Sequence, residues 1–297
     1  MKRYALAITV LALLVIAAAS LGAASRENRP QNIILIGWDG VQREHLKECI
    51  ARNEIPHLMK LSSEGAMVDI DVNGATDTKA GWAQILTGYK PEITGVYSNK
   101  NYRPIPKGYT VFERLENSLG NNAIVTAAII AKNGNVGAKP GQPYFYTKEG
   151  MDLFINALGK NEAVTRKALE TMEKYKNRPF FFFIHYGEVD HMGHRQGENS
   201  KEYNDAIVSC DTALGLIVKK LRELKLYDRT LVYVTADHGF DEGMTHHHNA
   251  PRVFLATNDK GAKHPGHRED ITPTIVKRFG LDLKQIKPPL DGKPLDR

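Results

Sequence analysis

Cysteine is scarce in this sequence: Cys49 and Cys210 are the only two in a chain of 297 residues. No cysteine lies near residue 24, where an N-terminal apolar segment ends, which excludes attachment of a lipid at that point. Both cysteines fall in segments that we expect to be helical. In an oxidising compartment they can form a disulfide, or they can remain as two buried thiols. The sequence leaves both states open.

The sequence also lacks a basic cluster, an internal repeat and a low-complexity tract. The formal net charge is +6, but Lys and Arg are scattered through helical patterns such as 218–225. Scattered charges are typical of a solvated surface, so we expect no nucleic-acid polymer as a partner. With 42% hydrophobic and 25% charged residues, the chain has enough apolar material for one large core, and we expect a single domain.

The first 24 residues are typical of a secretory signal. Lys2 and Arg3 precede an apolar stretch, 5–19, and small residues follow at 22–24. We expect cleavage near residue 24, a folded domain over 25–297, and a periplasmic or extracellular location. The apolar run 5–24 is also about 20 residues long, the length of a membrane-spanning helix. An uncleaved anchor, and contact with a membrane through it, is therefore the alternative.

Apolar strand-like runs alternate with amphipathic helical patterns after the signal. The strand patterns lie near 32–38, 67–72, 122–131, 180–186, 230–236 and 252–257, and the helical patterns near 43–52, 79–87, 161–176, 201–225 and 270–279. Continuous apolar runs separated by helices predict an α/β fold with a doubly wound, mostly parallel sheet and helices on both faces. Two long irregular segments, 89–110 and 132–150, are expected to line a site, and ordered surface connections are the alternative.

Three of the apolar runs end in carboxylates. Asp39 follows the first run, Asp190 follows the fourth with His194 four residues later, and Asp237 follows the fifth with His238 directly after it. In an open α/β sheet this edge is where ligands bind. A single Asp at a strand end is most often a cap or turn residue, but three such positions, two of them paired with His, favour a metal site. The mixed carboxylate and imidazole set suits zinc, and also manganese or iron.

Thr78 is the candidate nucleophile. It lies where polar residues lead from a short strand into a helix, so its hydroxyl is expected at the positive end of the helix dipole, which favours an alkoxide. A metal ion nearby would lower the pKa of that hydroxyl further. The alternative role for Thr78 is a helix N-cap, and Thr76 competes with it for either role.

A run of three histidines, His246, His247 and His248, precedes the last apolar strand pattern. One of them is enough to complete a metal site, and the strand that follows favours an ordered position over an exposed loop. His246 is our first choice as a ligand and His247 the second.

These residues together resemble the alkaline phosphatase superfamily, and within it the type I phosphodiesterase and nucleotide pyrophosphatase group, with sulfatases as more distant relatives. The resemblance runs from Asn32 to about Gly280. Its motifs are a strand ending in a metal-binding Asp, a nucleophile ten residues before the Gly of a segment like LLTG, a D..GH pattern and a DHG signature. They are matched in order by Asp39, by Thr78 counted back from Gly88, by Asp190 with His194, and by Asp237 with His238. The later histidine is matched by His246 or His247.

The resemblance implies two divalent metal ions, zinc by preference. By analogy, one ion is held by Asp39, Thr78, Asp237 and His238, and the other by Asp190, His194 and His246. It also implies in-line attack of Thr78 on phosphorus and a covalent phosphothreonine that water then hydrolyses.

The sequence departs from parts of the family pattern. Sulfatases carry a Cys or Ser in a segment like C.PSR, whereas Thr78 is followed here by Lys79, Ala80 and Gly81, which disfavours sulfate esters. Asn99 matches an Asn whose amide binds a phosphate oxygen in the group. Lys79 and Asn101 are further substrate-binding candidates, and solvated loop positions are the alternative for all three.

We therefore expect an exported two-metal hydrolase of phosphoric esters, a phosphodiesterase or a phosphatase, acting on a phosphorylated small molecule or on a lipid or glycan. A phospho-group transferase on lipid or glycan would use the same residues. A non-catalytic metal-binding protein would keep the metals and hydrolyse nothing.

Overall fold

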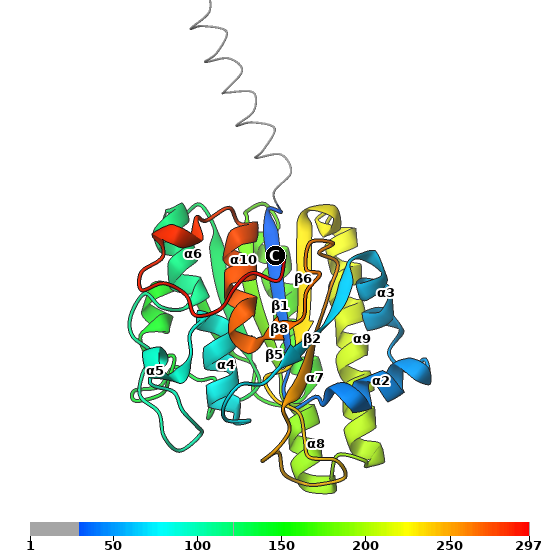
Figure 1. The fold of residues 1–297 in the computed structure, drawn as a ribbon. Coiled ribbons are helices and arrows are strands. Elements are labelled where there is room, and N and C mark those ends of the chain that lie inside the picture. The colour runs from blue at the N-terminus through cyan, green and yellow to red at the C-terminus, as the bar shows by residue number, and fades with distance from the viewer. Residues whose placement is uncertain (1–29, 121, 297) are drawn as a thin grey trace, which may run out of the picture.

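The computed structural model describes residues 30–120 and 122–296, whose strands form one eight-stranded sheet (Figure 1). The strands are β1 (Asn32–Trp38), β2 (Ala66–Asp71), β3 (Val125–Ile130), β4 (Leu153–Asn156), β5 (Phe180–Tyr186), β6 (Thr230–Thr235), β7 (Arg252–Thr257) and β8 (Gly266–His267). Their order is β4-β3-β5-β1-β6-β7-β2-β8. Only β7 opposes the others, being antiparallel to both β6 and β2. The sheet is thus mostly parallel, as predicted.

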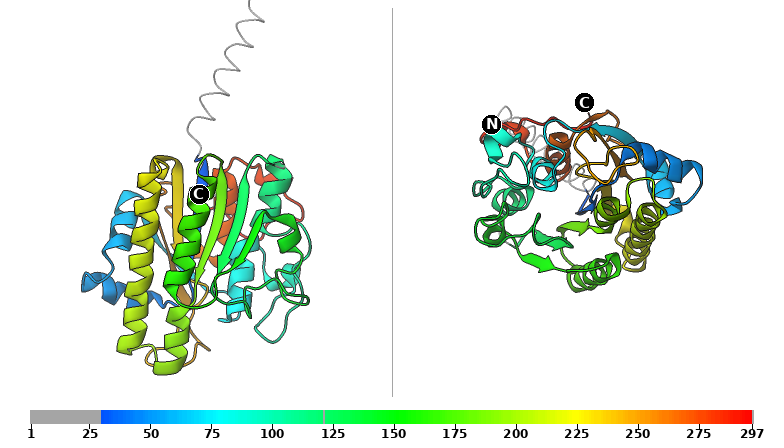
Figure 2. Two further views of the ribbon diagram at one scale, coloured as in Figure 1. Left: turned by 180° about the vertical axis from the view of Figure 1, so that it is seen from behind. Right: turned by 90° about the horizontal axis from the view of Figure 1, so that it is seen from below.

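Helices cover both faces of the sheet. The α-helices are α2 (Arg43–Ala51), α3 (Pro56–Glu64), α4 (Thr78–Thr87), α5 (Pro91–Thr94), α6 (Val111–Leu119), α7 (Asn161–Tyr175), α8 (Glu188–Gln196), α9 (Lys201–Glu223) and α10 (Ile271–Arg278). Helices α4, α6 and α10 lie on one face, and α7 and α9 lie on the other (Figures 1 and 2). Every residue of β1, β3 and β5 is buried between them, which is why these strands read as unbroken apolar runs.

All six predicted strands and all five predicted helices are present, within a few residues of their predicted ends. The sequence patterns missed the short strands β4 and β8 and the helices α3, α5, α6 and α8. Helix α8 directly follows β5 and is short and mostly polar, so it has few apolar residues to mark it as a helix. The reversed direction of β7 was also not predicted, because a buried apolar run reads the same in either direction.

The carboxyl ends of β1, β5 and β6 meet at one edge of the sheet, the lower edge in Figure 1. Parallel pairing aligns Trp38 of β1 with Tyr186 of β5, and Gly37 with Thr235 of β6. The segments that follow these three strands therefore start side by side. This register, and not any local sequence feature, brings the predicted ligands together.

Cys49 and Cys210 lie in α2 and α9, the helices expected for them, and both are buried free thiols. The two cysteines therefore form no disulfide in this structure. The predicted signal over 1–24 lies outside the described residues. Among the residues that are described, no helix combines the length and the apolar character needed to cross a membrane.

Candidate functional site

Hydrogen bonds donated by backbone N–H groups tie the three strand ends together around Asp39. The Asp190 N–H donates to the Asp39 carbonyl at 3.0 Å, and the Gly40 N–H donates to Oδ1 of Asp237 at 3.2 Å. Gly40 has a φ of 81°, and a Cβ there would lie 2.9 Å from the Asp190 Cα. Glycine is therefore required at this turn for both its left-handed backbone and the close approach of Asp190.

His238 lies at the centre of the three carboxylates. Its Nε2 is 3.6 Å from Asp39 Oδ1 and 3.6 Å from Asp190 Oδ1, and 3.4 Å from Asp237 Oδ2. Its Nδ1 bonds the Gly239 carbonyl at 3.0 Å, which requires that Nδ1 carry the proton. The lone pair on Nε2 therefore points toward the carboxylates, as in a metal-ligating histidine.

A second group of ligand atoms adjoins the first. His194 Nε2 lies 3.4 Å from Asp190 Oδ1 and 3.2 Å from His247 Nε2. Because Nδ1 of His194 bonds the Thr245 carbonyl at 2.9 Å, its Nε2 also presents a lone pair. Two sets thus have ligand atoms close enough to share an ion, Asp39 with Asp190 and His238, and Asp190 with His194 and His247.

The donor set fits divalent metal ions. Oδ1 of Asp190 and Oδ2 of Asp237 are buried and have no hydrogen-bond partner among the described residues, and an unpartnered buried carboxylate oxygen needs an explanation such as a bound ion. Burial, together with the charge of Asp39, raises the pKa of Asp237 well above its ordinary value. A cation at this position would remove that penalty. Carboxylate oxygens with imidazole nitrogens are the ligands of zinc sites.

Thr78 is the first residue of α4, and its hydroxyl lies 3.2 Å from His238 Nε2. The N-cap of this helix is Asp77, in extended conformation, so the structure does not use Thr78 as the cap. The Thr76 hydroxyl donates a hydrogen bond to the His247 carbonyl, which commits it to that loop. Of the two threonines, Thr78 is therefore the one whose hydroxyl faces the cluster, at the helix N-terminus.

The histidine run requires a correction to our order of preference. His246 is exposed, with its Nδ1 2.9 Å from Asp241 Oδ2, and its ring stacks on that of His248 at 4.6 Å. The backbone N–H of His248 also bonds Asp241, and both outer histidines are exposed. His247 points the other way, and its ring stacks on His238 at 4.0 Å. The structure places His247, and not His246, among the clustered side chains that could hold an ion.

Two of the three substrate-binding candidates lie beside the start of α4. Oδ1 of Asn99 accepts the N–H of Lys79 at 3.0 Å, and Nζ of Lys79 donates to the Asn99 carbonyl at 3.1 Å. The Asn99 N–H also bonds Asp77 at 2.9 Å. Asn101 is exposed, and its carbonyl accepts two N–H groups of its own loop. The structure thus holds Asn99 and Lys79 next to Thr78 and leaves Asn101 at the surface.

Sequence reasoning missed two residues of the site, Lys132 and His185. Nζ of Lys132 donates to Asp39 Oδ1 at 2.9 Å and also to Asp190 Oδ2. Nε2 of His185 lies 2.8 Å from Asp39 Oδ2. Lys132 follows β3 at the same sheet edge, so the strand-end rule applied to cations would have found it. His185 lies inside a continuous apolar strand, and no sequence signal separates it from a core histidine.

Burial and nearby charges keep Asp39, His238 and His247 in metal-binding forms, whereas the hydrogen bond to Asp190 raises the pKa of His194. Burial alone would raise the pKa of Asp39, but Lys132 and His185 outweigh it and hold this pKa below its ordinary value. Burial lowers the pKa of His238. Burial, with His238 as neighbour, lowers the pKa of His247 to about 4. At neutral pH both imidazoles are therefore neutral and Asp39 is ionised, as metal ligation requires.

Two buried charged residues hold the segments that carry the site. Arg268 is fully buried and donates to Gln84, to the Asp237 carbonyl at 2.8 Å, and to the carbonyls of Asn73 and Ala75, just before Thr78. It thereby joins the end of β6 to the turn that leads into α4. Glu198 accepts the N–H of Gly243 at 3.0 Å and fixes the base of the histidine loop.

The fold is shared with solved structures of known proteins. A protein of the alkaline phosphatase superfamily from Vibrio parahaemolyticus superposes with a TM-score of 0.65 at 18% identity, covering 91% of this chain and 70% of that one. The lipoteichoic acid synthase LtaP from Listeria monocytogenes superposes with a TM-score of 0.63 at 18% identity, covering 89% of this chain and 75% of that one. The fold is therefore that of the alkaline phosphatase superfamily, as the resemblance implied.

The family is defined by sequence. The type I phosphodiesterase / nucleotide pyrophosphatase model matches residues 33–260, so the chain belongs to this family of phosphoric-ester hydrolases. Human bis(5′-adenosyl)-triphosphatase ENPP4 is 25% identical over 227 residues, which cover 73% of this chain and 49% of the relative. The chain thus spans about half the length of that relative. The predicted family is confirmed.

Proposed function

We propose that this protein hydrolyses phosphoric esters through Thr78, with two divalent metal ions bound at the carboxyl edge of the sheet. The observation that carries the proposal is the position of the Thr78 hydroxyl. It lies at the N-terminus of α4 and 3.2 Å from His238 Nε2. Beside it are three buried carboxylates, the buried His238 and His247, and the exposed His194. A hydroxyl in this setting has the features of an activated nucleophile.

The residues present divide into two ligand sets. Asp39, Thr78, Asp237 and His238 would hold one ion, and Asp190, His194 and His247 would hold the other, with zinc preferred by this chemistry. Ions bound there would lower the pKa of the Thr78 hydroxyl and offset negative charge on the phosphoryl group and the leaving oxygen. The short separation of the two sets follows from Asp190, whose Oδ1 approaches both His238 and His194.

Thr78 supplies the covalent chemistry. Its hydroxyl gives up a proton and Oγ1 forms a bond to phosphorus as the bond from phosphorus to the leaving oxygen breaks. The leaving oxygen takes up a proton, which gives an alcohol and a phosphothreonine. Water then attacks phosphorus, the bond to Oγ1 breaks, and the hydroxyl is restored. The α4 dipole stabilises negative charge at Oγ1 in both steps. Asn99, whose Oδ1 accepts the N–H of Lys79 beside Thr78, would bind a phosphoryl oxygen through its amide N–H.

Kinetics of Thr78 variants test this proposal directly. Thr78→Ala should lower kcat on aryl phosphate monoester and diester substrates by at least about 1000-fold, because the nucleophile is lost. Thr78→Ser should keep a measurable fraction of the rate. Thr212→Ala, an exposed threonine on α9, is the matched control. An Ala variant at position 78 that retains the wild-type rate would contradict the assignment, and preferential hydrolysis of an aryl sulfate would contradict the substrate class.

A phospho-group transferase remains the second use of the same residues, and an acceptor assay separates the two. A transferase forms a phosphorylated lipid or glycan when the corresponding alcohol is added, whereas a hydrolase passes the phosphoryl group to water and forms no such product.

Export is part of the proposal as well. Mass spectrometry of the mature N-terminus should find cleavage near residue 24, whereas an intact N-terminus in the membrane fraction would indicate the anchor.

A further inference from the structure

Lys79 is the only buried lysine within residues 30–120 and 122–296, with an exposed fraction of 7%. It directly follows Thr78 in α4, so its side chain starts next to the proposed nucleophile. Its ammonium group donates a hydrogen bond to the Asn99 carbonyl at 3.1 Å and lies 4.2 Å from the centre of the Tyr102 ring. The charge of Lys79 is thus held against the loop that carries Asn99.

The contacts of the Lys79 ammonium group in the described part of the chain include no carboxylate. Asp77, two residues earlier, accepts the N–H of Asn99 at 2.9 Å instead. An ammonium group has three N–H donors, of which the Asn99 carbonyl takes one, and the face of Tyr102 attracts the charge without accepting a conventional hydrogen bond. Because a buried charge is ordinarily paired with one of opposite sign, the group that Lys79 lacks is an anion.

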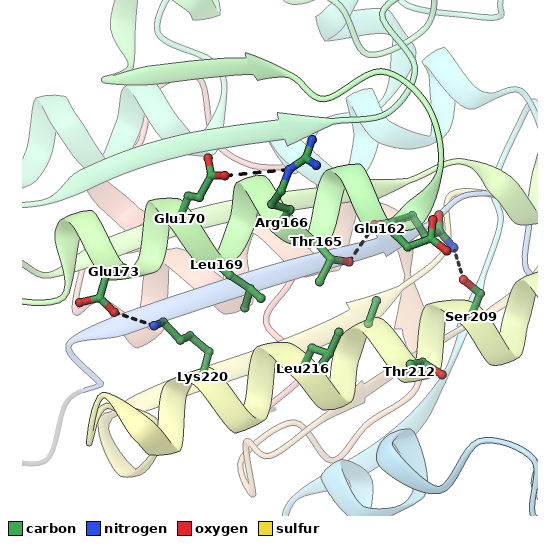
Figure 3. A pocket seen from close by; sticks show the side chains of 12 residues that line it. Glu162, Thr165, Arg166, Leu169, Glu170, Glu173, Ser209, Thr212, Leu216 and Lys220 are labelled. Atoms are coloured by element: carbon green, nitrogen blue, oxygen red, sulfur yellow. Dashed lines mark hydrogen bonds and ion pairs between the residues drawn. The ribbon is translucent and has the colours of Figure 1, made fainter.

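Lysines that are less buried have the partner that Lys79 lacks. Nζ of Lys132 bonds two carboxylates of the strand-end cluster. In a cavity of about 530 Å³ between α7 and α9, Nζ of Lys220 lies 2.6 Å from a carboxylate oxygen of Glu173 (Figure 3). The combination of burial, an unpaired charge and a position next to the proposed nucleophile therefore distinguishes Lys79 from both.

The two common kinds of phosphoric ester would present different charges to this ammonium group. Above the second pKa of a phosphate, a monoester carries two negative charges on three non-bridging oxygens. A diester carries one negative charge on two such oxygens, because its second organic group takes the third position. A diester bound at Thr78 would place that neutral group where a monoester has an anionic oxygen, and the charge of Lys79 would stay unpaired. Such a site discriminates through the cost of the unpaired charge.

We propose that Lys79 selects phosphate monoesters over diesters by binding a non-bridging oxygen of the reacting phosphoryl group. The inference rests on the proposed function and narrows the substrate class of the same site. Asn99 is assigned there to one phosphoryl oxygen, and the Lys79 ammonium group bonds the backbone carbonyl of the same residue. The two side chains therefore contact neighbouring oxygens of one phosphoryl group. Lysine suits this task because its ammonium group donates charge-assisted hydrogen bonds to phosphate as a compact point charge.

The ratio of kcat/KM for 4-nitrophenyl phosphate to that for bis(4-nitrophenyl) phosphate tests the inference, at about pH 8, where the monoester is a dianion. Wild type should favour the monoester. Lys79→Met removes the charge, keeps an unbranched stem, and should lower the ratio about 100-fold, whereas Lys79→Arg should retain most of it. Lys100→Met, which removes an exposed lysine next to Asn99, is the control and should leave the ratio unchanged.

Binding of inorganic phosphate to the metal-replete protein provides a readout independent of catalysis. Isothermal titration calorimetry should show an affinity about tenfold weaker in Lys79→Met than in wild type and in Lys100→Met. A wild type that favours the diester, an unchanged ratio in Lys79→Met or an unchanged phosphate affinity overturns the inference. If wild type hydrolyses neither ester, the proposed function fails, and the titration with phosphate still decides whether Lys79 binds the anion.

Discussion

At the residue scale, the histidine loop illustrates how neighbours in sequence acquire opposite surroundings. His247 is mostly buried against His194 and His238, whereas His246 is exposed and bonded to Asp241. The sequence places three identical side chains in a row and offers no signal to choose between them. The choice is made by Asp241, whose carboxylate binds the outer two residues.

This difference gives a prediction for metal binding. His247→Ala should lower the metal content by about one ion per chain and reduce kcat by at least about 100-fold, since it removes a ligand. His246→Ala, its matched control, should retain the wild-type metal content and the wild-type kcat. Metal analysis by mass spectrometry after gel filtration, together with kinetics, checks the outcome. Equal metal loss in both variants would contradict the geometry.

At the scale of elements, Arg268 joins segments that are distant in sequence. It precedes α10 yet donates hydrogen bonds to the end of β6 and to the turn before α4. A buried guanidinium bonded mostly to carbonyls loses hydration without a direct carboxylate partner, and burial accordingly lowers the pKa of Arg268 to about 10. The hydrogen bonds offset that cost by satisfying carbonyls beside the site.

Arg268→Gln should therefore affect both stability and catalysis. Loss of its bonds leaves buried carbonyls unsatisfied, which should lower the free energy of unfolding by at least about 2 kcal/mol. It should also reduce kcat, because Asp237 and the Thr78 turn are no longer held together. Arg278→Gln in α10, which breaks the bond to Asp259, is the control expected to lower stability alone. Kinetics at a temperature where both variants are folded separate the effects, and a wild-type kcat for Arg268→Gln would rule out a positioning role.

At the scale of the whole molecule, a buried pair links α2 to the base of the histidine loop. Nδ1 of His45 lies 2.8 Å from Glu198 Oε1, and both residues are buried. Burial opposes protonation, but hydrogen bonds to Cys49 and Glu198 outweigh it and raise the pKa of His45 from 6.5 to about 10. Because the pKa of His45 is raised in the folded state, the contribution of the pair to the free energy of unfolding is fully present below pH 6.5. This contribution is lost as pH rises through about 10.

Chemical denaturation across this pH range tests the pair. His45→Gln should lower the free energy of unfolding by about 3 kcal/mol below the ordinary histidine pKa. The difference from wild type should shrink as pH rises toward 10. Subtracting the free energy of unfolding of the variant from that of wild type at each pH cancels the contributions of other groups that titrate in this range. A difference independent of pH would show that His45 is neutral in the folded protein.

Metal removal should destabilise the whole fold. Asp39, Asp190 and Asp237 come from three segments, so ions bound between them favour the folded state by mass action, by about 2.7 kcal/mol at a free metal concentration of 100 times Kd. Treatment with a chelator should lower Tm, and added zinc should restore it. A Tm that stays constant while the metal content falls to zero would argue against metal ions bridging the strand ends.

The sequence by itself determined the order of the main strands and helices and the residue types at the sheet edge. Both are local properties: buried parallel strands need continuous apolar runs, and Asp39, Asp190 and Asp237 directly follow such runs. The spacing of Thr78 from Gly88 likewise belongs to one contiguous segment. These features were enough to identify the family.

Only the tertiary structure decided which side chains share the site. His247 was distinguished from His246 by Asp241, and Lys132 and His185 reached Asp39 through the pairing of β3, β5 and β1. The pocket that Lys132, Lys160 and Arg195 line also joins segments that lie far apart along the chain. Such contacts depend on strand register and loop direction, which arise from packing across the whole sheet and leave no periodic signal in any one segment.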